Sequence, residues 1–402
     1  MIYLPLANIL HHSLRSVLSA LGIGVGVCML IALAGLASGT VGEVADRWES
    51  VDADLIVFPR GWGDNAVNKS GSALSDKLVS LILASHGDIV ERAVPVFTDN
   101  VKFGRQNQMV AGVDPHQWDM LSGGRRLSAG RLFDRDNRFA AWIEQQLLTE
   151  RAEELSIEPA DLSSPQHNGL EIVIDERLAA VEGYRVGDVV SGANHQWTVT
   201  GIVPAGAMTR VFMPRRTAQY LFGSGNISRS TLIFIKLKRG VNAGPAARAI
   251  EATVENDVKG ISEYRGMLLR TWKMMFTYIN IVNGIAVAIA FLFTMITLYT
   301  MVLQQRREIA ILKSCGAGWA FILRQVLGEA MLLAAGGAII GIALSFAVKL
   351  AIERFLPLMT ITITWQWIAI ALVAAAAGAA ISALYPAWRA ARVDMIEALA
   401  LE

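Results

Sequence analysis

An uncharged stretch near the start of the chain, SVLSALGIGVGVCMLIALAGLASGT at residues 16–40, decides the fold. About 20 helical residues suffice to cross the hydrocarbon core of a bilayer, because each residue advances a helix by about 1.5 Å. This run therefore predicts a membrane-spanning helix. Its apolar part is longer than that of a typical secretion signal, so we expect an anchor that is not cleaved.

Three further apolar runs predict spanning helices at residues 274–305, 329–352 and 360–388, and their only charged residues are Glu329 and Lys349, near the two ends of the second of these runs. The composition agrees with a membrane protein, because 53% of the 402 residues are hydrophobic and 18% are charged. We expect no charged residue deep inside a span and place Glu329 at the mouth of the third, which argues against a proton relay or an ion-coupled carrier. The formal net charge of +1 argues against a nucleic-acid-binding protein, which usually carries a basic excess.

Basic residues near the ends of the spans predict the orientation, because Lys and Arg are retained on the cytoplasmic side. One set of ends carries the larger group: Arg15, Arg306, Arg307, Lys313, Arg324, Arg389 and Arg392. The short connection between the third and fourth spans offers Lys349 and Arg354. We therefore expect both termini in the cytoplasm and residues 41–273 outside it.

The segment between the first two spans, residues 41–273, is punctuated by Gly and Pro and is typical of a globular domain. Residues 41–51 keep helical spacing, so the first helix is expected to continue out of the bilayer. Strands are predicted at 53–58, 92–97, 108–113, 171–174, 196–203 and 231–237, and helices at 75–84, 138–155 and 243–258. The predicted fold class is an α+β membrane protein, with four transmembrane helices and a large mixed α/β extracytoplasmic domain between helices 1 and 2.

No pattern in the sequence indicates a catalytic residue or a metal site. Four acidic residues close in sequence are interpreted as solvated surface carboxylates, because no partnering pattern accompanies them: Glu171, Asp175, Glu176 and Asp188. Cys28 lies in an apolar run and Cys315 on the expected cytoplasmic side, so both are predicted to be free thiols. The phosphate-binding pattern GxxxxGK[ST] does not occur, so ATP is expected to bind another chain.

Several strings, taken in order, resemble the ABC transporter permeases of the family that includes MacB, LolC, LolE and FtsX. In the first span and the outer segment they are LANILHHSLRSVLSALGI at 6–23, ADLIV at 53–57, AGVDP at 111–115, EIVIDERLA at 171–179 and TVTGIV at 198–203. The resemblance implies a cytoplasmic amphipathic elbow helix at residues 1–15 and a MacB-like periplasmic domain at 41–273. A charged, helical insert at 139–166 departs from the family's pattern.

Two further strings are the most specific. RREIAILKSCGA at 306–317 resembles the segment of that family that couples the permease to its ATPase, and YPAWRAARVDMIEAL at 385–399 is similar to its C-terminal signature. By resemblance, the coupling residues are Arg306, Arg307, Glu308, Lys313 and Gly316, and the signature residues are Arg389, Arg392, Asp394 and Glu397. The pattern itself predicts a short amphipathic helix that Gly316 can end, within a cytoplasmic segment 306–328, and a cytoplasmic tail at 389–402.

Small and polar residues in the spans leave two alternatives open. Gly22 and Gly26 permit close helix packing, and Asn280 and Asn283 can form hydrogen bonds across helices. These four residues suit either packing within the chain or an interface with a second permease subunit.

The resemblance implies a permease of the bacterial inner membrane in the mechanotransmission class, also called type VII. A separate ABC ATPase would hold ATP and Mg²⁺, and the permease would pair with a second copy or a related subunit. Membrane lipid and a periplasmic adaptor or carrier protein are further implied partners, and no nucleic acid is. The implied function is export or extraction of a lipophilic, peptide or lipoprotein cargo. The alternative is an FtsX-like regulatory transducer that activates a cell-wall hydrolase or senses a ligand without transport.

Overall fold

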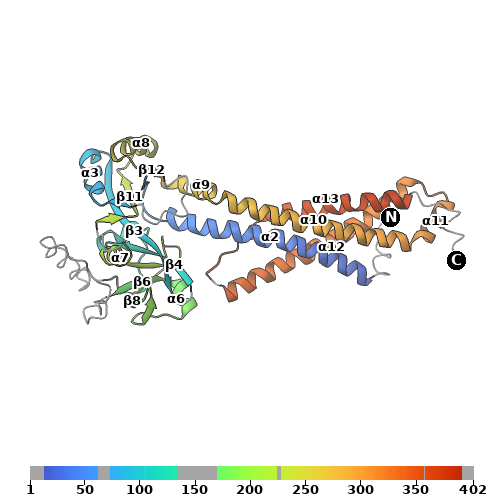
Figure 1. Ribbon diagram of the computed structural model, residues 1–402, viewed down its shortest axis with the longest axis horizontal. Helices are drawn as coiled ribbons and strands as arrows, with labels where there is room; N and C mark the ends of the chain where they lie inside the picture. The colour runs from blue at the N-terminus through green and yellow to red at the C-terminus, as the bar shows by residue number, and fades with distance from the viewer. Residues whose placement is uncertain are drawn as a thin grey trace. The chain divides into compact units, whose positions relative to one another are not determined.

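The computed structural model describes residues 13–61, 73–104, 106–133, 170–223, 228–356 and 358–391, and the structural statements below concern these residues. The chain folds as two compact units (Figure 1). The helical unit comprises residues 1–40 and 273–402, and the outer unit comprises residues 41–272.

In its described residues, the helical unit has four long apolar helices and one short helix. The long ones are α2 (Ser13–Glu49), α10 (Lys273–Gln304), α12 (Trp319–Phe355) and α13 (Trp365–Ala391), and the short one is α11 (Arg306–Ser314). All four long helices are long and apolar enough to cross a membrane. Helix α13 packs along both α12 and α10, and the core between the helices is made mainly of alanine and branched aliphatic side chains.

Two helix bounds differ from the predicted spans in an informative way. Helix α2 continues without a break to Glu49, beyond residue 40, as its helical spacing indicated. Helix α12 begins at Trp319 rather than at residue 329, because Ile322 and Val326 are apolar residues on a buried face of that helix. Glu329 consequently lies about 15 Å from the start of α12 at 1.5 Å per residue, and its side chain is buried. Glu329 thus lies within α12 rather than at its first residue, and its place at the mouth of the span stays a prediction.

The outer unit is organised around one large mixed sheet with the order β12-β1-β11-β3-β4-β9-β6-β8-β5, in which β7 pairs with β3 and β8. A small second sheet pairs β10 with β2. The strands are β1 (Leu55–Phe58), β2 (Leu74–Ser75), β3 (Val90–Phe103), β4 (Gln106–Val113), β5 (Ala129–Gly130), β6 (Glu171–Asp175), β7 (Val189–Gly192), β8 (His195–Val203), β9 (Val211–Pro214), β10 (Arg229–Ser230), β11 (Leu232–Leu237) and β12 (Asp257–Gly260).

Seven helical segments accompany these strands: α3 (Lys77–His86), η2 (Pro115–Gln117), α4 (Trp118–Leu121), α6 (Glu176–Glu182), α7 (Arg215–Phe222), α8 (Ala243–Val254) and α9 (Ile261–Thr271). Helices α3 and α8 lie together, and Ile82 and Ile250 pack with Leu55 and Ile233 of the central strands. Most pairings in the sheet are antiparallel, but β4 with β9 and β6 with β8 are parallel. The mixed α/β character expected for this domain is confirmed.

The predicted helix at 243–258 was too long. Glu255 adopts a left-handed conformation with φ of 53°, which ends α8, and residues 257–260 then form strand β12 beside β1. The predicted helix at 138–155 and the insert at 139–166 lie outside the described residues.

Candidate functional site

Helix α11 has one buried face and one charged face. Ile309 and Ala310 are buried against the helical unit, while Arg307 and Glu308 are exposed. Lys313 is half-buried, and the side chain of Arg306 lies outside the described residues. The helix therefore presents charge at its surface while its apolar side holds it to the bundle, which is an arrangement suited to docking a partner.

Gly316 ends α11 in a left-handed conformation with φ of 92°. The Gly316 amide donates to the Lys313 carbonyl at 2.9 Å, and the Ala317 amide donates to the Leu312 carbonyl at 3.0 Å. These two bonds form a Schellman motif, which satisfies carbonyls left free at a helix end. The expectation that Gly316 ends the helix holds, and the motif fixes the direction in which the chain enters α12.

The C-terminal signature is described only in part. Arg389 lies on α13, and its guanidinium carbon is 5.7 Å from the centre of the Tyr299 ring on α10, within the range of a cation–π interaction. Arg392, Asp394 and Glu397 lie outside the described residues, as does most of the elbow segment 1–15.

The glycines considered as an interface pack within the chain. A Cβ atom at Gly22 would lie 3.1 Å from the Phe293 ring, and one at Gly26 would lie 3.2 Å from Ala290 Cβ, so both glycines let α2 approach α10 closely. Asn283 is buried and its Oδ1 accepts no hydrogen bond from the described residues, whereas Asn280 is exposed. The structure therefore does not bring the four residues together as one surface.

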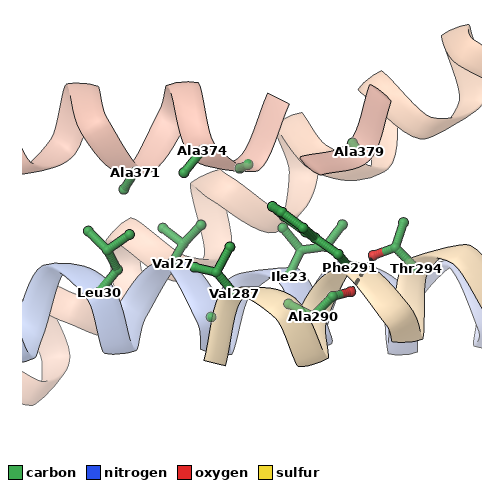
Figure 2. A pocket seen from close by; sticks show the side chains of 12 residues that line it. Ile23, Val27, Leu30, Val287, Ala290, Phe291, Thr294, Ala371, Ala374 and Ala379 are labelled. Carbon is green, nitrogen blue, oxygen red and sulfur yellow. Dashed lines mark hydrogen bonds between the residues drawn. The ribbon is translucent and has the colours of Figure 1, made fainter. Parts of the chain in front are cut away.

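A small apolar cavity lies among α2, α10 and α13 (Figure 2). Phe291 reaches from α10 toward α13, and its ring occupies the space where Gly378 has no side chain. The cavity volume is about 20 Å³, which is room for roughly one water molecule. This space is too small to pass a solute.

The C-terminal end of α2, residues 41–49, belongs to the outer unit and is held to the rest of that unit by a buried ionic network. Arg47 donates to Asp175 at 3.0 Å, to Glu43 at 3.0 Å and to the Ala207 carbonyl at 3.1 Å. Glu43 also accepts from Arg210 at 2.9 Å. Arg47 and Asp175 are both buried, and such a pair is stable only when its charges are well hydrogen-bonded, as they are here. We call these residues the Arg47 network.

Asp175 was interpreted as a solvated surface carboxylate, and that interpretation was wrong. The residue has no exposed surface, and its second oxygen accepts from the Leu178 amide at 2.7 Å, which caps α6. Of the other three carboxylates, Glu176 and Asp188 are exposed, and Glu171 is partly buried beside Arg131 at 2.5 Å. Among the described residues, no group of three or more His, Cys, Asp or Glu side chains is placed to hold a metal ion.

A second contact joins α9, the helix that leads back to α10, to the same extension of α2. Arg265 donates to Asp46 at 2.5 Å and to Glu49 at 2.8 and 3.1 Å. The Trp48 and Tyr264 rings stack beside it with centroids 4.5 Å apart and planes 12° apart. We call these residues the Arg265 clasp.

Two pKa shifts describe this clasp. Hydrogen bonds to Glu49 and Asp46 raise the pKa of Arg265, so the guanidinium group stays protonated and positively charged in this contact. Burial raises the pKa of Tyr264, which keeps the ring neutral in the stack. The two segments through which the chain enters and leaves the outer unit are therefore fastened to each other.

Neither the Arg47 network nor the Arg265 clasp was predicted. The acidic and basic residues of α2 beyond residue 40 were visible as a helical, charged segment, but their partners are more than 100 residues away in sequence. A salt-bridge partner at that separation leaves no local pattern to recognise.

Two known domains match most of the chain. Residues 16–253 match the MacB-like periplasmic core domain, and residues 280–395 match the FtsX-like permease C-terminal domain. The macrolide export ATP-binding/permease protein MacB of Hahella chejuensis is 26% identical over 413 residues, which cover 97% of this chain and 58% of that protein. The protein of the same name from Neisseria gonorrhoeae is 24% identical, with 98% of this chain and 59% of that protein covered. The chain thus spans less than two thirds of the length of these relatives.

Two solved structures are similar to part of the chain. The periplasmic region of MacB from Actinobacillus actinomycetemcomitans is 15% identical, with a TM-score of 0.35, and covers 55% of this chain and 94% of its own. The extracellular domain of the noncanonic ABC-type transporter YknZ from Gram-positive bacteria is 12% identical, with a TM-score of 0.33, and covers 52% of this chain and 98% of its own.

Proposed function

We propose a mechanical role for this chain, which belongs to the permease family that combines a MacB-like periplasmic core domain with an FtsX-like permease C-terminal domain. The chain couples ATP hydrolysis by a separate ABC ATPase to movement of its outer unit. The ATPase holds ATP and Mg²⁺, and this chain supplies the docking helix and the moving domain. The membrane is the bacterial inner membrane, with both termini in the cytoplasm. The permease acts as a pair, with a second copy or a related subunit.

The observation that carries this proposal is the charged, exposed face of α11. Arg307 and Glu308 face away from the bundle while Ile309 is buried in it, so the helix is held firmly and its charges are free to meet a complementary surface. Glu308 makes no hydrogen bond or ion pair within the described residues, so nothing in this part of the chain neutralises it.

The fastening of the outer unit supports the mechanical part of the proposal. Movement of α2 reaches the outer unit through the Arg47 network, and movement of α10 reaches it through α9 and the Arg265 clasp. The cavity among α2, α10 and α13 is about 20 Å³, which favours work done on an external cargo over passage of a solute between these helices. The cargo proposed is a lipophilic molecule, a peptide or a lipoprotein, handed to a periplasmic adaptor or carrier protein.

The test is a charge reversal on α11. We expect Glu308→Lys to lower both retention of the ATPase during purification and the stimulated rate of ATP hydrolysis, because a like charge at a close contact costs several kcal/mol. Arg307→Glu is expected to act in the same way. The control is Asp88→Lys, an exposed reversal in the outer unit that should leave both measurements unchanged. Normal ATPase retention and coupling in both α11 variants would refute docking at this helix.

A further inference from the structure

An apolar groove lies at the end of the helical unit that bears α11, between the first turns of α12 and the last turns of α13. It is lined by Trp319, Leu323, Leu384, Tyr385 and Trp388, is open on one side and has a volume of about 600 Å³. That volume falls in the range of ligand sites, which is roughly 300–1,000 Å³. Trp319 and Leu384 are each 56% exposed, so the groove is a surface that the rest of the described bundle does not fill.

Two arginines are next to groove residues in the sequence. Arg389 follows Trp388, and its guanidinium lies over the Tyr299 ring, whose centre is 5.9 Å from the ring of groove residue Tyr385. Arg324 follows Leu323 on α12 and is exposed. Neither arginine pairs with a carboxylate of the described residues. The groove thus combines an apolar floor with unneutralised positive charge.

This combination fits a lipid better than a soluble ligand. Trp and Tyr side chains are amphipathic and gather at the level of lipid headgroups, where one end of the ring is apolar and the other meets water. Basic pockets between transmembrane helices on the cytoplasmic side are suited to anionic headgroups, because that leaflet carries a negative surface potential.

We propose that the groove binds an anionic phospholipid, with an acyl chain along Trp319, Leu384 and Trp388 and the phosphate near Arg389 and Arg324. The proposal rests on the cytoplasmic placement of α11 given above. A bound lipid would lie beside the Gly318–Trp319 junction that connects α11 to α12. The lipid composition of the leaflet would therefore affect how α11 is held for docking.

A second copy of the chain is a poorer occupant. A twofold interface brings the same patch of both subunits together, so two patches that each carry Arg389 and Arg324 would approach each other. Like charges placed opposite each other oppose association.

The test uses the full chain in detergent micelles that contain phosphatidylglycerol or phosphatidylcholine with a dibrominated acyl chain, and it measures quenching of tryptophan fluorescence. We expect phosphatidylglycerol to quench at a lower mole fraction than phosphatidylcholine. Trp388→Phe should remove part of the phosphatidylglycerol-specific signal. Arg389→Gln and Arg324→Gln should each raise the half-saturating fraction of phosphatidylglycerol about fivefold, and Arg389→Lys should restore it, since a single basic side chain near an anionic surface contributes on that scale.

The matched control is Arg354→Gln, an exposed arginine in the last turn of α12, which should leave the half-saturating fraction unchanged. Equal quenching by the two lipids would overturn the proposal. So would an Arg354→Gln variant that raises the half-saturating fraction of phosphatidylglycerol as much as Arg389→Gln does. So would displacement of the lipid by glycerol phosphate, which would indicate a simple anion site. Disulfide-linked dimers of Leu384→Cys in a Cys28→Ser, Cys315→Ser background would identify a second copy as the occupant. No ATPase is present in this assay, so its outcome is independent of the docking test at Glu308.

Discussion

Arg47 and Asp175 form a 3.0 Å ion pair in which both residues are buried, and the pair joins the C-terminal end of α2 to the N-cap of α6. The carboxylate stands where β6 ends and α6 begins, and it also caps α6. Because the pair lies inside the outer unit, the extension of α2 is part of the fold of that unit and moves with it.

Removal of Arg47 should strongly destabilise the outer unit. Arg47→Met leaves Asp175 buried without its counter-charge, and breaking one partner of a buried pair costs about 3–5 kcal/mol. The measurement is the thermal unfolding midpoint of the purified full chain. The double variant Arg47→Met, Asp175→Asn should lose less stability than the sum of the two single variants, because the residues interact directly.

The control for this variant is Arg92→Met. Arg92 pairs with Glu91 at 3.5 Å, but both side chains are about half exposed, and such pairs contribute about 0–1 kcal/mol. An Arg47→Met protein as stable as the Arg92→Met protein would show that the buried pair is dispensable.

Gly316 should be sensitive to any side chain that resists its backbone conformation. Its φ of 92° is strained for a β-branched residue, and the left-handed region costs roughly 1–2 kcal/mol for an ordinary L-residue. A Cβ atom there meets nothing within 4 Å, so the effect comes from the backbone alone. We expect Gly316→Val to reduce ATPase coupling and Gly316→Asn to reduce it less.

Gly318→Val is the matched comparison. Gly318 also has open space around a Cβ, but its φ is −75°, which any residue can adopt. If Gly316→Val and Gly318→Val couple ATP hydrolysis equally well, the left-handed cap has no part in docking.

The proposed topology can be tested with single cysteines. Cys315 is an exposed free thiol and Cys28 is partly buried in α2. In a Cys28→Ser background, a membrane-impermeant maleimide should label Cys315 only after the cells are opened. In a chain that lacks both native cysteines, Ser80→Cys on α3 should be labelled in cells whose outer envelope alone is permeable. Labelling of Cys315 without opening the inner membrane contradicts the orientation.

Local patterns predicted much of this fold because the forces behind them are local. Strand β1 begins within the run ADLIV, and the uninterrupted apolar run at 16–40 lies within α2. The helical spacing of 306–313 predicted α11, and its apolar Ile309 is indeed buried. Helix α12 begins before the predicted span because a helix does not have to end where a charge such as Arg324 or Glu329 appears.

The short strands and the buried charges could not be predicted in this way. Strand β12, with the sequence DVKG, has no apolar run and forms because β1 offers it a partner. Asp175 resembles a surface carboxylate until α2 places Arg47 beside it, 128 residues away in sequence. These features follow from tertiary contacts, which override local preference.

The Arg265 clasp should make the extension of α2 and the helix α9 move as one piece. Spin labels at Val44→Cys and Leu269→Cys, both exposed positions, would report the distance between the two segments in a chain without the native cysteines. In the otherwise unchanged protein we expect a narrow distance distribution that ATP does not alter.

Arg265→Glu should broaden that distribution, because it sets a third carboxylate against Asp46 and Glu49. Since Arg265 is 41% exposed, solvent weakens its ion pairs, and the effect on unfolding should be small compared with the effect on the distance. The compensating variant Arg265→Glu, Glu49→Arg restores an opposite-charge pair and should narrow the distribution again, while Arg92→Glu at an exposed pair elsewhere should not change it. A distribution that stays narrow in Arg265→Glu would mean that the stacked Trp48 and Tyr264 rings hold the two segments without the ionic contact, and Trp48→Ala would then be the variant that separates them.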